Sequence, residues 1–173
     1  RVGERGKVVS VEPNPENLNI LRLNVELNGL KNVFVIPKAV GEAQRKATMY
    51  YPSSSSTAHT SAVRKHHMSF ETSMTTLDRI YFEHFEASNV KLVKIDTEGC
   101  DLQVLSGAEH TLSRSCYVIV EEGSEDVKQF LAKKGFRVKR VGPSQYLFGT
   151  NLALQHQFNE TTERTPHFPD YVA

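Results

Sequence analysis

One short segment combines acidic, basic and glycine residues in a pattern that could do chemistry. Lys94 and Asp96 are two positions apart, so in an extended strand both side chains lie on the same face. Glu98 and Gly99 follow, and glycine permits the backbone conformation of a sharp strand-to-helix turn. Burying charge is costly unless the charges are paired or functional, which favours a site at this segment. The alternative is an ion pair of Lys94 with Asp96 or Glu98 that stabilises the turn.

A second carboxylate, Glu12, ends an expected strand and precedes Pro13. In open α/β sheets ligands bind beyond the carboxyl ends of the strands, and a carboxylate there can accept two hydrogen bonds from the vicinal hydroxyls of a ribose. Ala39 and Val40, which precede Gly41, are small apolar residues that could lie against a planar base. The alternatives are a surface glutamate beside a turn and an ordinary strand end.

Histidines provide a reserve candidate for a general base. His59, His66 and His67 lie in or beside a segment rich in serine and threonine. An imidazole can accept the proton of a hydroxyl, and His59 is the candidate that we retain, although most loop histidines are simply solvated. We predict no metal site, because the histidines have no second cluster and Cys100 and Cys116 are too few for a four-ligand zinc site.

The first elements that must position these residues are a strand and a helix. β-branched residues predict a strand over Lys7–Glu12. Asn14 is a favoured N-cap, so we predict a helix over Asn14–Asn28 that Gly29 terminates. The apolar stripe of this helix is expected to comprise Leu18, Leu21 and Val25, widened by Ile20 and Leu27.

The chain then leaves strict strand–helix alternation between residues 43 and 75. Val33–Ile36 predicts a second strand, buried on both faces as in a parallel sheet. Further strands are predicted over Ala47–Tyr51 and Met68–Thr75, with a polar loop over Pro52–Ser61 between them and a helix from Leu77. An irregular insertion of this kind is usually where specificity is built.

Alternation resumes in the second half of the chain. The predicted elements are a strand over Val90–Asp96, a helix over Asp101–Leu112, a strand over Tyr117–Val120, a helix from Ser124 to Gly135, and an antiparallel hairpin formed by Phe136–Val141 and Gln145–Phe148. The predicted fold class is therefore α/β, with a mostly parallel sheet and a C-terminal antiparallel hairpin. This layout resembles the Rossmann-like class I methyltransferase fold, and a fold by itself does not give the chemistry.

Composition excludes several classes of function. The chain has 173 residues, with 21 Lys and Arg against 20 Asp and Glu. This balance lacks the clustered basic surface of a nucleic-acid-binding protein, so we expect no nucleic-acid partner. No apolar run reaches the ~20 residues that span a bilayer and no signal peptide opens the chain, so we expect no membrane span and a cytoplasmic location. We expect one domain over residues 1–154 and a poorly ordered polar tail over 155–173.

Several motifs, taken in order, resemble the FkbM-type family of S-adenosylmethionine-dependent methyltransferases. They are VSVEPNPEN at 9–17, NGLKNV at 28–33, KAVG at 38–41, TTLD at 75–78, LVKIDTEG at 92–99 and VLSGA at 104–108. The similar stretch runs from about Gly6 to about Glu122. Any one motif would be weak, whereas the ordered set is quite specific.

The resemblance implies S-adenosyl-L-methionine as cofactor and O-methylation of a hydroxyl on a sugar or natural product, that is, a small-molecule or carbohydrate acceptor. Glu12 would take the ribose hydroxyls, while Ala39 and Val40 would lie beside the adenine. The implied cofactor-binding residues are Glu12, Pro13, Asn14, Ala39, Val40 and Asp96. The implied catalytic residues are Asp96, Glu98 and Lys94, with His59 in reserve. The insertion would form a lid over the acceptor.

One feature of the family is missing from the sequence. The family begins with a strand and a Gly-rich loop under the methionine part of the cofactor, and no such pattern precedes the strand that ends at Glu12. We therefore expect an N-terminally truncated domain with an incomplete cofactor site, because that strand would lie between the strands ending at Glu12 and Asp96. The alternative functions are a degenerate methyltransferase fold that acts as a non-catalytic binding module and, with less support, a nicotinamide-dependent dehydrogenase.

Overall fold

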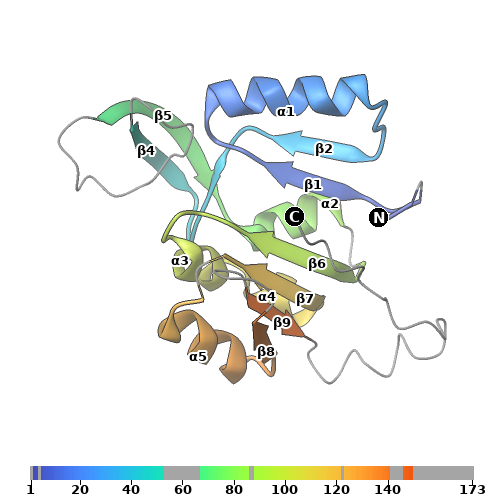
Figure 1. The fold of residues 1–173 in the computed structure, drawn as a ribbon, viewed down its shortest axis with the longest axis vertical. Helices are drawn as coiled ribbons and strands as arrows, with labels where there is room; N and C mark the ends of the chain where they lie inside the picture. The colour runs from blue at the N-terminus through green and yellow to red at the C-terminus, as the bar shows by residue number, and fades with distance from the viewer. Residues whose placement is uncertain are drawn as a thin grey trace.

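The structure, a computed structural model, describes residues 2–3, 5–52, 67–85, 88–121, 123–140 and 146–149 (Figure 1). The strands are β1 Val8–Val11, β2 Val33–Ile36, β3 Ala39–Val40, β4 Arg45–Pro52, β5 His67–Thr75, β6 Val90–Ile95, β7 Ser115–Val120, β8 Arg137–Arg140 and β9 Tyr146–Gly149. The helices are α1 Pro15–Leu27, α2 Leu77–His84, α3 Asp101–Ser106, α4 Glu109–Ser113 and α5 Glu125–Lys133. None of these helices is long and apolar enough to cross a membrane.

The N-terminal strand, helix and second strand confirm the sequence prediction. β1 and β2 pair in parallel, from Val8 opposite Val33 to Val11 opposite Ile36. The Asn14 side chain caps α1 by accepting the Glu16 N–H at 2.9 Å. The helix ends in a Schellman motif at Gly29, whose φ is 60°. In that motif the Gly29 N–H donates to Glu26 O and the Leu30 N–H to Val25 O.

Burial in this region differs from the prediction in two respects. Leu18 is buried and Leu21 and Val25 are half-buried, but Ile20 and Leu27 are exposed and do not widen the inward stripe. The prediction that β2 is buried on both faces is also wrong, because Phe34 is 40% exposed and its neighbours are only half-buried. Among the described residues β1 and β2 form a sheet of their own, and no residue of either strand belongs to the main buried core.

A second small sheet combines β3 with the two strands of the insertion, in the order β3-β5-β4. β4 and β5 pair antiparallel from Arg45 opposite Met74 to Pro52 opposite His67, while β3 runs parallel to β5. These strands confirm the two that were predicted here. Of the predicted loop over Pro52–Ser61, Pro52 belongs to β4 and residues 53–61 lie outside the described residues. The inward side chains form a small core of Ala39, Ala47, Met49 and Met74.

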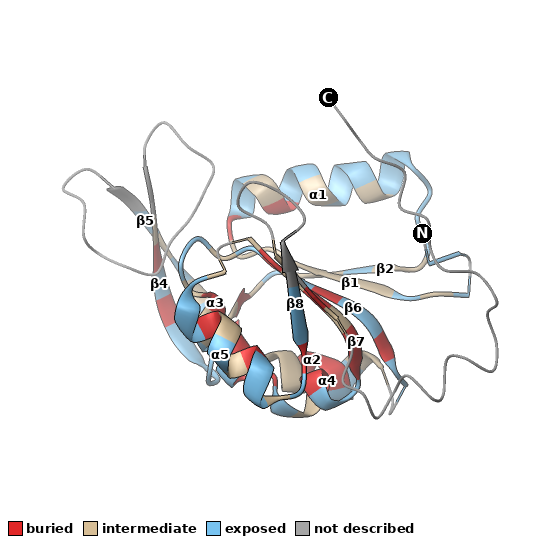
Figure 2. Ribbon diagram, turned by 60° about the horizontal axis from the view of Figure 1, so that its bottom comes forward, coloured by how far each residue is buried: buried red, intermediate tan, exposed pale blue. Residues whose placement is uncertain are grey.

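The second half of the chain forms a four-stranded sheet, in the order β6-β7-β9-β8. β6 and β7 are parallel, and β9 runs antiparallel to both β7 and β8, which confirms the predicted C-terminal hairpin. The main core lies between this sheet and its helices, and its most buried members include Tyr81, Leu105, Leu112, Val118, Val120, Leu131 and Phe148. Figure 2 shows buried residues concentrated in this half, whereas most of α1 is exposed.

The single helix predicted over Asp101–Leu112 is wrong, because the structure divides it into α3 and α4. At the break, a Cβ on Gly107 would lie 2.3 Å from Gly41 O. Asp78 of α2 supplies the hydrogen bonds that a continuous helix would have made. Its N–H donates to Gly107 O, and its carboxylate accepts the N–H groups of His110 and Thr111 at 3.0 and 2.7 Å.

The described strands form three sheets, whereas one mostly parallel sheet was predicted. β1 pairs with β2 and β6 pairs with β7, and no described strand bonds β1 to β6. Figure 1 nevertheless shows the arrows of β1, β2 and β6 pointing the same way, so their carboxyl ends lie on one side of the molecule. The structure therefore has the predicted α/β class with parallel strands. The candidate residues Glu12 and Asp96 directly follow the carboxyl ends of two of these strands, β1 and β6.

Candidate active site

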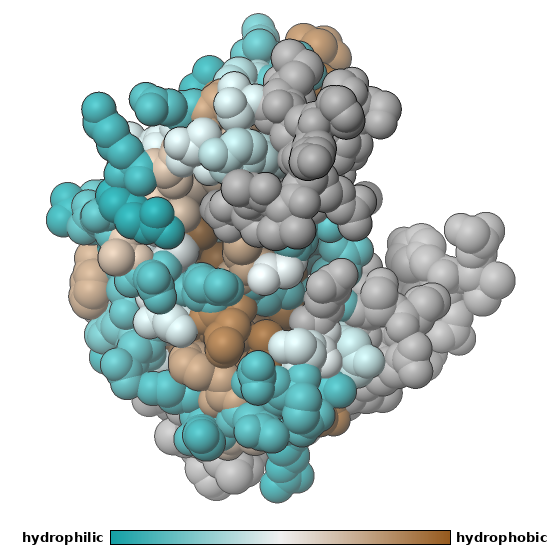
Figure 3. Space-filling view, turned by 90° about the vertical axis from the view of Figure 1, so that its left-hand side faces the viewer, coloured by the Kyte–Doolittle hydropathy of each residue, from teal (hydrophilic) through white to brown (hydrophobic). Residues whose placement is uncertain are grey.

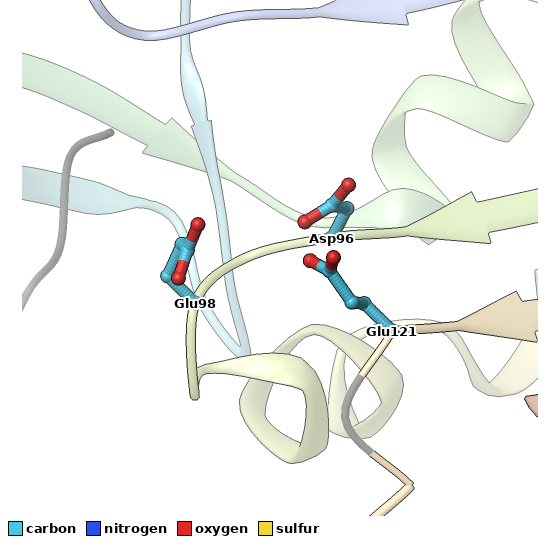
Figure 4. A group of neighbouring side chains, drawn as sticks. All are labelled: Asp96, Glu98 and Glu121. Atoms are coloured by element: carbon cyan, nitrogen blue, oxygen red, sulfur yellow. The ribbon is translucent and has the colours of Figure 1, made fainter. Parts of the chain in front are cut away.

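Two neighbouring parallel strands bring Asp96 and Glu121 together. β6 and β7 end with Ile95 opposite Val120, so Asp96 and Glu121 occupy the next position along each strand. The Glu121 N–H also donates to Ile95 O at 3.3 Å, which extends the backbone pairing to the acidic residues. Figure 4 shows the two carboxyl groups turned toward each other.

A tight turn places Glu98 beside this pair. Glu98 has a φ of 51° and Gly99 a φ of 92°, so both adopt the left-handed conformation that glycine tolerates best. Asp101, which is buried, holds the turn by accepting the Thr97 N–H at 3.2 Å and the Thr97 hydroxyl at 2.6 Å. Carboxylate oxygens of Asp96, Glu98 and Glu121 consequently all lie within 4.8 Å of one another.

Lys94 forms an ion pair with Asp96, with Nζ 2.5 Å from Oδ2. The structure therefore contains one of the two ion pairs that the sequence left open. The side chains are 53% and 38% exposed, and ion pairs at such exposure contribute at most about 1 kcal/mol to stability.

Asp96 and Glu121 shift each other's pKa in opposite directions. The hydrogen bond with Glu121, and then that with Lys94, hold the pKa of Asp96 below its ordinary value. The pKa of Glu121 is raised by the same hydrogen bond with Asp96, by the negative charge of Asp96 and, to a smaller extent, by Glu98. Because the two carboxyl groups interact this strongly, they titrate as a pair.

Three carboxylates at this spacing could also surround a cation. Asp96 and Glu98 are exposed and Glu121 is half-buried, and exposed acidic groups commonly lie this close without a metal. Ca²⁺ takes at least six oxygen ligands, and three carboxylates alone do not make such a site. We therefore describe the group as a cluster of three acidic residues and assign no metal to it.

Glu12 lies at the end of β1, where the sequence placed it. Its N–H donates to Ile36 O at 3.1 Å, and its Oε1 accepts the Asn14 N–H at 2.8 Å. Pro13 is half-buried and Asn14 is buried, so both support the turn into α1. A carboxylate has about four acceptor positions, so one hydrogen bond to Asn14 leaves Glu12 able to accept others.

Of the remaining candidate residues, Ala39 and Val40 are described by the structure, and they pack against different cores. Ala39 is buried in the small core of the insertion, and Val40 packs against the main core. His59 lies outside the described residues. A shallow hollow between α1 and β2, lined by Arg22, Val25, Glu26, Gly29, Leu30, Lys31 and Val35, contains none of the predicted site residues.

The side of the molecule that the strand ends face is partly apolar. Figure 3 views this side and shows an apolar area near its centre, with hydrophilic residues around it. Such a mixture suits a ligand with an apolar part and a few polar groups.

Glu121 is not among the site residues that the sequence predicted. Its signal was of the same kind as that of Asp96, namely an acidic residue directly after a buried strand. The pairing of β6 with β7 was needed to show that the two acidic residues meet.

Comparisons with known proteins agree on one family. A family model described as "Methyltransferase FkbM domain" matches residues 1–138. The crystal structure of a methyltransferase FkbM from Methylobacillus flagellatus KT is similar in fold, with a TM-score of 0.52 and 16% identity. The match covers 83% of this chain and 36% of that one, so the chain spans about a third of the length of that protein. A search of curated proteins gave no significant match.

Proposed function

Because the chain belongs to the FkbM methyltransferase domain family, we propose that it contributes the reaction centre of an S-adenosylmethionine-dependent O-methyltransferase. The observation that carries this proposal is the meeting of Asp96, Glu98 and Glu121 at the ends of two parallel strands. Carboxylates in this position suit a positively charged sulfonium ligand and the removal of a proton from an acceptor.

The chemistry of the residues fits the cofactor. Glu12 keeps acceptor positions for the two ribose hydroxyls while it holds the Asn14 N–H. Asp96 and Glu98 follow β6, whose arrow points the same way as that of β1 in Figure 1, so both lie on the same side of the molecule as Glu12. Pro13 and Asn14 shape the turn that carries Glu12, and Val40 remains a candidate neighbour of the adenine. Ala39 contributes at most through its backbone, because its side chain is covered by the insertion core.

The residues of the chain would act mainly by alignment and proton transfer. When bound, S-adenosylmethionine supplies a methyl group activated by its sulfonium. Asp96 accepts the proton of an acceptor hydroxyl as the oxygen takes the methyl group, while Lys94 holds the Asp96 carboxylate in place. A sugar or natural-product hydroxyl is the acceptor class that the family resemblance favours. The hairpin of β4 and β5 is our candidate for the acceptor lid.

We also propose that, in the full-length protein, a further strand lies between β1 and β6. Among the described residues β1 bonds to β2 and β6 to β7, which leaves each strand with an unpaired edge. Figures 1 and 2 both draw β1 and β6 as neighbours with their arrows pointing the same way. Unpaired edges within a fold are costly, and a strand there would complete the sheet beneath the cofactor.

Titration of S-adenosylmethionine into the full-length protein tests the proposal. We expect binding, and a 10- to 100-fold weaker affinity for Glu12→Ala, because hydrogen bonds to a charged group contribute about 1.5–3 kcal/mol. Glu12→Gln keeps an acceptor for the Asn14 N–H, and Glu26→Ala on exposed α1 is the matched control, with no change expected.

Three outcomes of this titration would contradict the proposed roles of Glu12 or of the whole protein. Equal affinities of Glu12→Ala and the wild type would remove the ribose role of Glu12. No binding at all would overturn the methyltransferase proposal and favour the non-catalytic binding module. Binding of a nicotinamide dinucleotide in its place would favour the dehydrogenase.

A further inference from the structure

Helix α1 presents an apolar stripe to the outside of the molecule. This outer face consists of Ile20, Leu23 and Leu27, continued by Leu30 after the helix, and the four residues are between 45% and 73% exposed. A helix turns by about 100° per residue, so the stripe lies roughly opposite Val25, which borders the hollow between α1 and β2. Figure 2 shows much of α1 as exposed. Single apolar residues are normal on a surface, whereas a contiguous stripe indicates a contact surface.

Charged residues lie at both ends and on one flank of the outer face. Glu16 precedes the apolar residues and Lys31 follows them. Arg22 and Glu26 lie on the flank that borders the shallow hollow, as Lys31 does. All four are exposed, and none of them forms an ion pair with another described residue. Their charges are therefore available to a partner.

The apolar residues of the outer face are placed so that they can pack against themselves. Ile20 and Leu27 are equally distant from a point between Leu23 and Asn24. If two copies of α1 cross antiparallel with a two-fold axis at that point, Ile20 of each copy faces Leu27 of the other. The two Leu23 side chains then meet beside the axis. Such a contact is isologous, which means that the same surface is used on both copies.

The charges complement each other in the same antiparallel arrangement. Glu16 and Lys31 are equally distant from the axis, so Glu16 of one copy lies opposite Lys31 of the other. Arg22 of one copy comes within one position of Glu26 of the other, on the flank that the two copies share. Parallel helices would place each charge beside an identical one. Charge complementarity of this kind determines the partner and its orientation more than the affinity.

We propose that the outer face of α1 binds the same face of a second copy of the chain, with the two helices antiparallel about a two-fold axis at Leu23. The strand proposed between β1 and β6 would extend the sheet beneath α1, so it would not cover this face. A contact made by one short helix from each copy is small, so the dimer should depend on concentration. The proposal is independent of the methyltransferase function, because the outer face contains none of the candidate site residues.

Sedimentation equilibrium of the full-length protein, between about 1 and 500 μM, tests the proposal. The wild type should pass from monomer to dimer as the concentration rises. Leu23→Glu should raise the dissociation constant by at least about 50-fold, because it places two carboxylates in an apolar contact at the axis. Phe82→Glu is the matched control, since Phe82 is an apolar residue of α2 that is 60% exposed, and this variant should dimerise like the wild type.

An exchange of two charges tests the antiparallel arrangement. Arg22→Glu should weaken the dimer by about 10-fold at low salt, because the two-fold axis brings like charges together at two places. Arg22→Glu combined with Glu26→Arg restores opposite charges at both places, so the double variant should recover most of the wild-type affinity. Both positions are exposed, so these variants test the proposal even if Leu23→Glu fails to fold.

Each of four results would overturn the proposal. A wild type that stays monomeric over the whole range does not form this dimer. A monomer whose urea midpoint falls in Leu23→Glu would show that another part of the full-length protein covers the outer face. A dimer that Leu23→Glu leaves intact would use a different surface. If the double variant does not recover the affinity that Arg22→Glu loses, the helices do not pair in this antiparallel arrangement.

Discussion

Asp101 is the residue that holds the acidic turn in place. It is only 3% exposed, and one of its oxygens accepts both the N–H and the hydroxyl of Thr97. Because removing a buried acceptor leaves its donors unpaired, we expect Asp101→Ala to lower the free energy of unfolding by about 1–3 kcal/mol. Urea denaturation measures this change.

The conservative variant shows which property of Asp101 matters. Asp101→Asn retains one side-chain oxygen for Thr97, so most of the lost stability should return. Because the turn carries Glu98, Asp101→Ala should also weaken S-adenosylmethionine binding. An Asp101→Ala protein as stable as the wild type would show that the turn does not depend on this residue.

Some of the candidate site could be predicted from local sequence and some could not. The Lys94–Gly99 segment was identifiable because alternation in a strand and the conformational freedom of glycine are local properties. Glu121 was missed because its importance comes from pairing with a strand 25 residues earlier, as in Val90 opposite Ser115. The burial of Ala39 was likewise set by Met74 of β5, which its own sequence neighbours do not reveal.

The helices show the same division between local and distant causes. α1 and α5 begin where predicted because Asn14 and Ser124 bond to N–H groups of their own helices. The α3–α4 break depends on contacts from two other parts of the chain, the Gly41 backbone and the Asp78 carboxylate. An apolar repeat that spans such a break predicts one helix, because the pattern contains no trace of the distant contacts.

Gly107 should be sensitive to any added side chain, since the break requires its close approach to Gly41. A Cβ there would lie 2.3 Å from Gly41 O, which is backbone and cannot move freely. We expect Gly107→Ala to reduce the free energy of unfolding by about 1–3 kcal/mol, as overpacking usually does. Ser106→Ala, at an exposed neighbouring position, should change it by less than about 0.5 kcal/mol. Equal urea midpoints for the two variants would contradict this account of the break.

For the molecule as a whole, the proposed cofactor site requires the separate sheets to combine into one binding surface. The strand ends that carry Glu12 and Asp96 lie on the same side, yet they belong to different sheets among the described residues (Figure 1). A cofactor that contacts both residues would need the two sheets to be held at a fixed spacing. A strand paired with both edges would provide that spacing, because neighbouring strands lie about 4.8 Å apart.

Hydrogen exchange in β1 tests for such a strand. The N–H groups of Val8 and Glu12 donate to Asn32 O and Ile36 O of the β2 segment, at 3.0 and 3.1 Å. Since successive N–H groups in a strand point to opposite edges, those of Val9 and Val11 face away from β2. If a further strand pairs with β1 in the full-length protein, the amides of Val9 and Val11 should exchange as slowly as that of Ser10 between them. Fast exchange at Val9 and Val11 beside a slow Ser10 would leave β1 as a true edge strand, and S-adenosylmethionine would then have to bind without a continuous sheet beneath it.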